Sequence, residues 1–579
     1  MYRRFCPTVY SGVEIGTGTA WCGTAEVEPG FDSARRASNQ WAISPERTAS
    51  GNAMLLVDPH LAWWGVSRFW EVRVHAGELA GSGVTLAGSP YIGLGHNRDV
   101  AWAMTTGGPD TADVYRLELH PEDPQRYRYD GDWREMETRE VTLAVRDAEP
   151  ETHTLRFSHH GPIIASRPDE NRAWAARVAY DVDAKRNEAW FELNFATDYK
   201  GAVRAGDTLG MFPQNMMVAD TSGNIYYQRV GRVPKRPEGH DYSKPLDGST
   251  PETEWQGLHP AEDHVQILNP PQGYMQNCNI PPDAMMVDSP LQPGDYPDYL
   301  FASAHYGPDR SGWTNQRGAR ALELLAGDSD VTVEEATAWA LDVKPYGTER
   351  WLTALDEATE GRTLAPAAAD IAELLQRWEG RLTADSRSAQ LYAQWRRTLK
   401  NAMGAEAFRA LRDDLEPWYA ETATSGEVPE RDPLTEAQKT ALANALHEVA
   451  GEGVEGPTWG DVHRVGRDDA SWPVGGGGDD SLGLTTLRTV GYGEPRADGT
   501  RRGRHGQTST QLIVLSDPIR SWIYLPVGQS DRPDSPHYDD QAEHLFSPRR
   551  IKPSRWQPEA LAGHVASRTV LGGAPSGEP

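Results

Sequence analysis

The sequence has few cysteines, few lysines and no long hydrophobic run. Three cysteines in 579 residues cannot form a disulfide framework, and no CxxC pair or His/Cys cluster predicts zinc binding. Only Cys6 and Cys22 could pair within the N-terminal segment, and we expect free thiols. No apolar stretch approaches the roughly 18 residues of a membrane helix, and the N-terminal segment lacks the apolar core of a signal peptide.

The charge balance is strongly acidic. Asp and Glu number 84 against 57 Lys and Arg, which gives a net charge of −27, and Lys supplies only eight of the basic residues. This balance disfavours nucleic acid and anionic lipid as partners. With 38% hydrophobic and 24% charged residues, the composition is that of an ordinary folded protein, large enough to bury an extensive core.

The residue patterns predict an α+β fold in which strands flank a helical insertion. Residues 1–37 are rich in Gly and Thr and lack periodicity, so we interpret them as a leader or the remnant of a longer N-terminal region. Residues 38–314 contain short apolar runs between Gly, Pro and Asp turns, which indicate strands. Residues 315–455 show helical periodicity and two capping boxes, Thr332 with Glu335 and Thr435 with Gln438. Strand character returns over 456–579.

Ser38 is the first candidate catalytic residue. A serine at the start of a chain carries its own base, because an α-amine has a pKa of about 7.7–8.0 and can take the proton from its own Oγ. Ser38 gains such an amine only if the bond to Ala37 is cut. Taken alone, the residue is far better explained as an ordinary loop serine, so the case for a nucleophile depends on the motifs that follow.

The motifs around and after Ser38 resemble one family. They are SNQWAIS, TASGNAMLLVDPHL, GSPYIGLGHNRDVAWAMTT and GPDTADVY, in that order. Together they resemble the opening of the penicillin acylase family of N-terminal-nucleophile hydrolases, and the resemblance extends to about Val570. It implies a four-layer αββα sandwich and autocatalytic cleavage between Ala37 and Ser38. It also implies a helical α chain before the nucleophile, where this sequence has only 37 residues.

The resemblance implies roles for four residues besides Ser38. His60, in DPHL, would orient the amine or relay a proton. The backbone N–H of Thr106 and the side chain of Asn279 would stabilise the tetrahedral oxyanion, although Asn277 lies in the same GYMQNCNIPP segment and either could cap a turn. Arg317 would keep the α-amine deprotonated through its positive charge; a surface ion pair is the alternative.

The resemblance also implies a calcium site and an acyl pocket. Hard oxygen ligands suit Ca²⁺, and the alternative is a solvated acidic turn. A further Glu ligand would come from the α region. Aliphatic pocket residues would favour a linear acyl chain, although they could equally be core residues. The expected calcium ligands are Asp110, Ala112, Asp113, Pro234 and Asp298, and the expected pocket residues are Leu61, Leu94 and Met104.

The leading hypothesis is therefore an amide hydrolase that forms an acyl-enzyme on Ser38 and acts on a small N-acylated amine. The acyl compound could be a β-lactam, an acyl-homoserine lactone or an acylated peptide. The alternative is an inactive or incomplete homologue without the α chain, which would act at most as a calcium-stabilised binding scaffold. The sequence leaves the compartment open, since members of the resembled family are usually exported.

Overall fold

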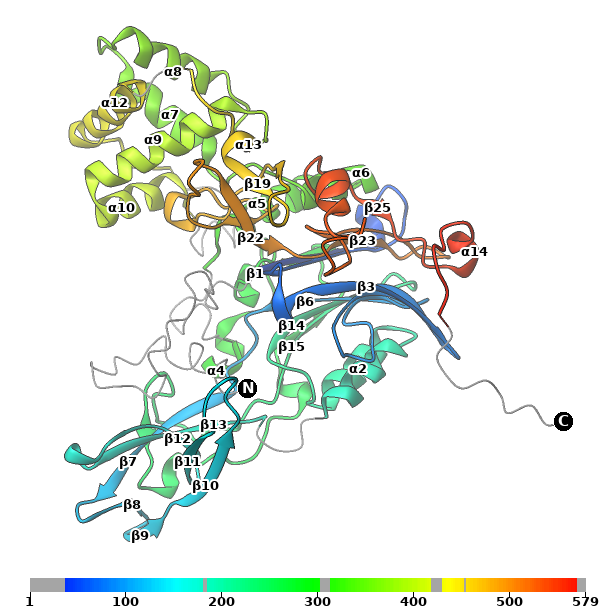
Figure 1. The fold of residues 1–579 in the computed structure, drawn as a ribbon, viewed down its shortest axis with the longest axis vertical. Helices are drawn as coiled ribbons and strands as arrows, with labels where there is room; N and C mark the ends of the chain where they lie inside the picture. Colours follow the sequence, from blue (N-terminus) through cyan, green and yellow to red (C-terminus); the bar gives the residue numbers. More distant parts are fainter. Residues whose placement is uncertain (1–36, 181–184, 302–312, 418–429, 452–454, 570–579) are drawn as a thin grey trace, which may run out of the picture.

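Ser38 lies in the centre of a ten-stranded sheet. The computed structural model describes residues 37–180, 185–301, 313–417, 430–451 and 455–569 (Figure 1). The path of the sheet runs β20-β19-β22-β2-β23-β24-β25; β1 pairs with β2, β18 pairs with β1, and β21 pairs with β22. Its strands are β1 (Ala37–Ile43), β2 (Met54–Ala62), β18 (Tyr274–Asn277), β19 (His463–Val465), β20 (Trp472–Pro473), β21 (Val490–Tyr492), β22 (Arg501–Gln507), β23 (Thr510–Val514), β24 (Arg520–Tyr524) and β25 (Lys552–Pro553).

A seven-stranded antiparallel sheet packs face to face against this sheet. Its order is β17-β15-β14-β6-β5-β4-β3, and β6 and β14 contact β1 and β2 across the interface. Its strands are β3 (Phe69–Ala76), β4 (Leu79–Leu86), β5 (Leu94–His96), β6 (Val100–Thr106), β14 (Gln214–Asp220), β15 (Ile225–Val230) and β17 (Gln266–Leu268).

Helices cover the outer face of each sheet. On the ten-stranded sheet, α5 (Gln316–Gly327) contacts β18 and α6 (Val333–Ala340) contacts β23. On the seven-stranded sheet, α3 (Tyr199–Asp207) contacts β14 and β15 and packs against α2 (Arg186–Asn194). The order helix, sheet, sheet, helix is the predicted four-layer sandwich, and the α+β prediction is confirmed (Figure 1).

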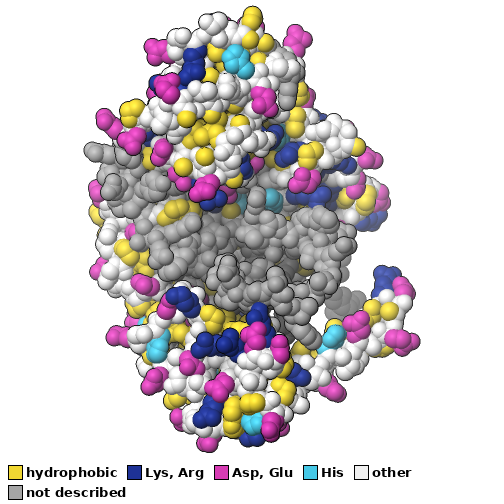
Figure 2. Space-filling view, turned by 90° about the vertical axis from the view of Figure 1, so that its left-hand side faces the viewer, with side chains coloured by type: hydrophobic (Ala, Val, Ile, Leu, Met, Phe, Trp, Pro, Cys, Tyr) yellow, Lys and Arg dark blue, Asp and Glu magenta, His cyan; other side chains and the backbone are white. Residues whose placement is uncertain are grey.

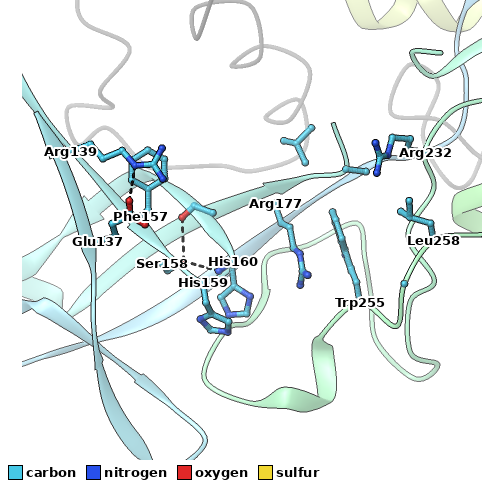
Figure 3. A pocket seen from close by; sticks show the side chains of 14 residues that line it. Glu137, Arg139, Phe157, Ser158, His159, His160, Arg177, Arg232, Trp255 and Leu258 are labelled. Carbon is cyan, nitrogen blue, oxygen red and sulfur yellow. Dashed lines mark hydrogen bonds and ion pairs between the residues drawn. The ribbon is translucent and has the colours of Figure 1, made fainter. Parts of the chain in front are cut away.

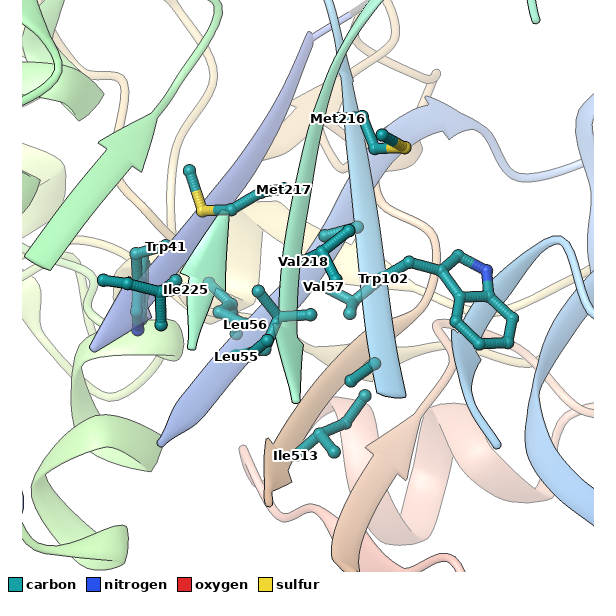
Figure 4. Packing of buried hydrophobic residues seen from close by; sticks show 14 of the residues in the cluster. Trp41, Leu55, Leu56, Val57, Trp102, Met216, Met217, Val218, Ile225 and Ile513 are labelled. Carbon is teal, nitrogen blue, oxygen red and sulfur yellow. The ribbon is translucent and has the colours of Figure 1, made fainter. Parts of the chain in front are cut away.

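The interface between the sheets is the main core. Met54, Leu55, Leu56 and Val57 of β2 are all buried, because one face of the strand meets the other sheet and the other meets the outer helices. This explains why the sequence shows a continuous apolar run there instead of alternation. Figure 4 shows Val57 of β2 and Val218 of β14 in the layer between the sheets.

A third sheet, of eight strands, forms a separate lobe with its own small core (Figure 1). Its order is β10-β11-β12-β13-β7-β8-β9, with β16 beside β7. The sequence did not distinguish this lobe from the sandwich. Its strands are β7 (Ala112–His120), β8 (Asp123–Tyr129), β9 (Asp132–Glu135), β10 (Glu137–Leu143), β11 (Glu151–Ser158), β12 (Gly161–Arg167), β13 (Arg172–Val178) and β16 (Leu246–Asp247).

The predicted helical stretch 315–455 divides between two parts of the structure. Its first two helices, α5 and α6, belong to the outer layer of the sandwich, whereas the others share a core that begins at Val343. These others are α7 (Thr348–Thr359), α8 (Pro366–Gln376), α9 (Arg387–Met403), α10 (Ala405–Leu415) and α12 (Glu436–Gly451). Further short helices are α4 (Asp298–Phe301), α13 (Trp459–Val462) and α14 (Pro558–Leu561).

A hydrogen bond from Gln316 of α5 to a buried ion pair joins this helix to the helical insertion. The Glu416 carboxylate accepts from Arg396 and from the Trp351 indole, both at 2.6 Å. Its other oxygen accepts from the Gln316 amide at 2.7 Å. Glu416 and Arg396 are fully buried, and Gln316 immediately precedes Arg317. The insertion is therefore connected by hydrogen bonds to the helix that carries a candidate catalytic residue.

Local predictions had mixed outcomes. Both capping boxes are present, with Thr332 bonded to Glu335 and Thr435 bonded to Gln438. The glycine-rich run GGGGDD, a composition typical of a flexible linker, is instead packed: Gly475, Gly476 and Gly477 are buried, and added Cβ atoms would meet neighbouring backbone. Cys278 is a buried free thiol, whereas Cys6, Cys22 and nearly all of the 1–37 segment lie outside the described residues.

The surface agrees with the acidic composition. Asp and Glu side chains are scattered over both the upper and the lower part of the face in Figure 2. Among the helices that the structure describes, none combines the length and the apolar character needed to cross a bilayer.

Candidate active site

The nucleophile candidate is buried at the start of β1. Ser38 is paired with Pro59 of β2 and is 3% exposed. Ser38 Oγ donates to the carbonyl oxygen of Ala37 at 2.5 Å. The backbone N–H of His60 lies 3.4 Å from the same Oγ. The hydroxyl is thus adjacent to the carbonyl that autocatalytic cleavage would attack.

Asn279 holds the backbone nitrogen of Ser38. This N–H donates to Asn279 Oδ1 at 2.6 Å, while Asn279 Nδ2 donates to the Thr106 carbonyl at 2.8 Å. Asn279 has a φ of 64°, a left-handed conformation that Asn tolerates better than most residues. Its amide therefore lies between Ser38 and Thr106.

Asn277 has a different environment. Its Oδ1 accepts from the Thr105 hydroxyl at 2.7 Å and from the Asn279 N–H at 3.0 Å, and its Nδ2 donates to the Ile280 carbonyl at 2.9 Å. These bonds occupy the amide and shape the turn after β18. Of the two asparagines, the structure brings Asn279 to Ser38 and uses Asn277 as a support.

Thr106 ends β6 beside Asn279. Its register partner on β14 is Gln214, and the Thr221 N–H bonds the Asp99 carbonyl further along the same pair of strands. Hydrogen-bonded pairs alternate with non-bonded pairs along an antiparallel ladder. Asp99 and Thr221 form a hydrogen-bonded pair, so every second residue of β6 after Asp99 is also in a bonded pair and Thr106 is in a non-bonded pair. The Thr106 N–H therefore points away from β14. The N–H is thereby directed out of the ladder, as an oxyanion donor must be.

Arg317 reaches the nucleophile from the first turn of α5. Asn315 caps this helix by accepting from the Gly318 N–H at 2.9 Å, which fixes where the first turn begins. The Arg317 guanidinium donates to the Ser38 carbonyl at 2.7 Å and to Asn279 Oδ1 at 2.9 Å. Arg317 is buried, so the surface ion pair considered for it is wrong.

His60 bonds to other partners than the sequence suggested. Its Nε2 lies 3.0 Å from Asp58 Oδ2 and 3.3 Å from Asn39 Nδ2, and its backbone N–H is the group that reaches Ser38. Burial lowers the pKa of His60 against an opposing effect of Asp58, which favours a neutral ring. His60 is thus a neighbour of the nucleophile, but its imidazole bonds to Asp58 and Asn39.

Sequence reasoning missed Asn39 and Asp58. Asn39 accepts from Arg317 at 2.6 Å and donates to Asp58 at 2.9 Å, and Asp58 also accepts from Gln507 at 3.0 Å. Asp58 and His60 are two apart on one strand and so share a face. That spacing was the available signal for Asp58, whereas Gln507 comes from a strand far along the chain.

The expected calcium residues gather at the start of β7. The Asp110 N–H donates to the Tyr299 carbonyl at 3.0 Å. This bond holds Asp110 beside α4, the helix that begins at Asp298. Pro234 lies two residues before Arg236, whose guanidinium bonds Asp113 Oδ2 at 2.8 Å and lies 3.3 Å from Asp110 Oδ2.

The donor set fits a hard cation. Asp113 Oδ1 is buried and has no hydrogen-bond partner among the described residues. Burial raises the pKa of Asp110 to about 6, with Arg236 acting to lower it and Asp113 to raise it further. Ala112, between the two carboxylates, donates its N–H to Asp110 Oδ1 at 3.2 Å, and its carbonyl is the expected ligand. An oxygen-seeking ion would satisfy the unpaired carboxylate oxygen and relieve the repulsion between the two aspartates.

The three expected pocket residues lie on adjoining strands of the sandwich. Leu94 and Met104, of β5 and β6, are buried in the main core, and Leu61 of β2 packs against that core. They belong to strands that also carry His60 and Thr106. The structure thus brings them to the region of the candidate site, and it leaves their role in acyl binding as a prediction.

Comparisons with known proteins converge on one family. Residues 6–563 match the model of the penicillin amidase family. Penicillin G acylase from Escherichia coli is 25% identical over 550 residues, which cover 87% of this chain and 62% of that protein. Acyl-homoserine lactone acylase PvdQ from Pseudomonas putida is 26% identical over 550 residues, covering 88% of this chain and 67% of that protein. The chain thus spans about two thirds of the length of these relatives.

A solved structure supports the fold. The thermostable penicillin G acylase from Alcaligenes faecalis superposes with a TM-score of 0.67 at 20% sequence identity, over 93% of this chain and 100% of that chain. The likeness extends across the sandwich and its insertion, so the fold predicted from the resemblance is confirmed.

Proposed function

Since the chain belongs to the penicillin amidase family, we propose that it hydrolyses the amide bond of a small N-acylated molecule, with Ser38 as an N-terminal nucleophile. The observation that supports this most directly is the meeting of Ser38, Asn279 and Arg317: the serine nitrogen and the guanidinium both donate to Asn279 Oδ1, at 2.6 and 2.9 Å. Three segments distant in sequence thus surround one buried serine.

The first step is cleavage of the chain itself. Ser38 Oγ attacks the Ala37 carbonyl carbon, the C–N bond to the Ser38 nitrogen breaks, and water hydrolyses the resulting ester. This leaves a carboxylate on Ala37 and a free α-amine on Ser38. The 2.5 Å contact from Oγ to the Ala37 oxygen supports this step, because the attacking atom is already beside its target.

The second step is acyl transfer from the substrate. The neutral α-amine takes the Oγ proton while Oγ attacks the amide carbon, and the same proton then passes to the departing amine. Arg317 lies against Asn279 and the Ser38 carbonyl, and its charge lowers the pKa of the nearby amine. Water finally attacks the ester and releases the carboxylic acid.

Two donors stabilise the negative oxygen in both halves of the reaction. They are the Thr106 N–H and Asn279 Nδ2, which lies 2.8 Å from the carbonyl oxygen of the same threonine. Donors fixed in advance are worth more than water, because they need no reorganisation as charge develops. His60 contributes its backbone N–H beside Oγ, while Asp58 and Asn39 hold its ring.

Calcium and a further region of the protein complete the proposal. Asp110, Ala112, Asp113, Pro234 and Asp298 would hold Ca²⁺, which would stabilise the connection between the eight-stranded lobe and α4 without taking part in the chemistry. An α-chain-like region, separate or upstream, would contribute a further ligand and part of the substrate pocket. Because Leu61, Leu94 and Met104 are aliphatic, we propose a substrate with a linear acyl chain. One group of relatives is named for action on such a class, the acyl-homoserine lactones.

Intact-mass measurement combined with an amidase assay tests the proposal. We expect a mature chain that begins Ser-Asn-Gln-Trp and releases fatty acid from an N-acyl-homoserine lactone. Ser38→Ala should stay uncut and inactive, whereas Ser38→Cys should still cut, because a thiolate is a strong nucleophile. Active protein with the Ala37–Ser38 bond intact would refute the mechanism. Uncut, inactive wild-type protein would favour the incomplete-homologue alternative.

A further inference from the structure

A pocket of about 400 Å³ lies in the eight-stranded lobe, on a different sheet from Ser38 (Figure 3). It is lined by the ends of β11, β12 and β13 and by the loop from Trp255 to Leu258. His159 and His160, in the turn between β11 and β12, point to the same side in Figure 3, and Arg177 lies beside them. The mechanism proposed above uses none of these residues.

A nitrogen from each histidine and one oxygen of Glu254 lie close enough together to bind a single metal ion. His159 Nε2 lies 2.9 Å from Glu254 Oε1, and His160 Nδ1 lies 3.5 Å from the same oxygen. All three atoms fall within 4.8 Å of one another. A tetrahedral zinc ion with bonds of about 2.0–2.2 Å holds its ligand atoms roughly 3.3–3.5 Å apart, and the two distances to Glu254 Oε1, 2.9 and 3.5 Å, are close to this value.

The second nitrogen of each histidine is held by another group. His160 Nε2 is 3.1 Å from the Gly248 carbonyl, which only accepts, so Nε2 carries the proton and Nδ1 carries a lone pair. His159 Nδ1 is 2.9 Å from the Tyr127 hydroxyl. Outer partners of this kind fix the ring orientation of metal-binding histidines. Stacking of His160 on Tyr115, with ring centroids 3.9 Å apart, adds to the fixation.

No described residue donates a hydrogen bond to the lone pair of His160 Nδ1. His160 is 2% exposed, and its Nδ1 is buried without a hydrogen-bond partner among the described residues. This nitrogen lone pair lies 3.5 Å from Glu254 Oε1, an arrangement that a cation between the two atoms would stabilise.

We propose that His159, His160 and Glu254 form a binding site for a divalent transition ion of the zinc class. Two imidazole nitrogens and one carboxylate favour such an ion over Ca²⁺ or Mg²⁺, which take oxygen ligands. Arg177 bonds the second Glu254 oxygen, Oε2, at 2.5 Å and leaves Oε1 for the metal. Three protein ligands leave a fourth position for water. No sequence pattern predicted this site, because Glu254 is separated from the histidines by 95 residues.

Cobalt and zinc titrations of the full chain test the site. After chelator treatment and return to buffer with excess Ca²⁺ to fill oxygen sites, one equivalent of Co²⁺ should give the intense visible absorption of tetrahedral cobalt, and Zn²⁺ should abolish it. Tyr127→Phe, which keeps the ring but loses the bond to His159, should weaken Zn²⁺ binding by roughly 10-fold. Glu254→Gln and His159→Gln should remove the stoichiometric signal.

The matched control is His153→Ala. His153 lies on β11 with Glu151 3.3 Å away but belongs to no three-ligand cluster in the described part of the chain, so this variant should bind as wild type does. Melting curves without metal show which variants are folded, and only folded variants are compared. Wild-type protein without the cobalt spectrum would overturn the proposal. So would folded Glu254→Gln and His159→Gln proteins that bind Zn²⁺ with unchanged affinity.

Discussion

Replacing Asn279 tests the centre of the proposed mechanism. Its Nδ2 is one of the two proposed oxyanion donors, and its Oδ1 accepts from both the Ser38 nitrogen and Arg317. Loss of one oxyanion donor lowers kcat by roughly 10²–10³, or about 2.7–4 kcal/mol of transition-state stabilisation. The amide also positions the nucleophile, so we expect a loss at the upper end of that range with a smaller change in KM.

Two substitutions separate catalysis from stability at this position. Because Asn279 has a φ of 64°, alanine places a Cβ in the left-handed region, at a cost of roughly 1–2 kcal/mol, whereas glycine adopts this conformation freely. Asn279→Gly and Asn279→Ala should therefore lose kcat alike, and only the alanine variant should show the added strain in its melting temperature.

The assay measures initial rates on an N-acyl amide, normalised to the cleaved fraction found by intact mass. Normalisation is needed because, in the proposed mechanism, the same donors stabilise the oxyanion formed during cleavage at Ala37. The reasoning would be refuted by an Asn279→Gly protein with kcat within a few-fold of wild type. Asn277 serves as the contrast: its amide supports the turn, so Asn277→Ala should mainly lower stability.

Three further predictions follow from other parts of the molecule. Chelation of calcium should lower the melting temperature of the wild-type protein but not of Asp113→Ala, and a variant that still responds to chelation would count against the site. Glu416→Leu should reduce the free energy of unfolding by roughly 3–5 kcal/mol, measured by urea denaturation, because a buried guanidinium loses its partner; unchanged stability would show that the pair is solvated. Burial lowers the pKa of His96 and His264 to about 4, below their ordinary value of 6.5. Their unfolded forms therefore bind more protons between these values, and stability from these groups falls as pH drops from about 6.5 to about 4. The raised pKa of Asp110, about 6, has the opposite effect on stability. His96→Gln removes one of the two histidine contributions, so it should flatten the measured fall in stability at low pH. An unchanged slope would contradict the assignment.

The sequence predicted the residues nearest the nucleophile better than their supports. Asn279 and Arg317 were found because short motifs around them resemble a family, and the structure brings both to Ser38. Asn39 and Asp58 were missed because their role depends on strand register, which links Asn39 of β1 to Asp58 of β2. Register arises from tertiary pairing, and no local pattern encodes its partners.

The same limit applies to the fold. Strands such as 510–514 were visible as apolar runs, but the separation of the eight-stranded lobe from the sandwich depends on which faces pack together. The helical periodicity of 315–455 did not show that α5 covers the sheet while α7 belongs to another core. Arg236 was likewise unpredicted, since it reaches Asp113 across 123 positions of sequence.

The pairing of β2 has a consequence for the order of events in the cell. β2 lies between β1, which carries Ser38, and strands β22 and β23, which are translated about 450 residues later. The Thr508 N–H bonds the Pro59 carbonyl at 2.9 Å, directly opposite Ser38 in the sheet. Until these late strands leave the ribosome, the sheet around the nucleophile lacks one side.

In the proposed mechanism, cleavage at Ala37 therefore depends on these late strands. A chain released before residue 501 would lack β22 and β23, and we expect its Ser38 to stay in a peptide bond and to be inactive. Maturation would then be coupled to translation of the strands that pair with β2 on the side away from Ser38.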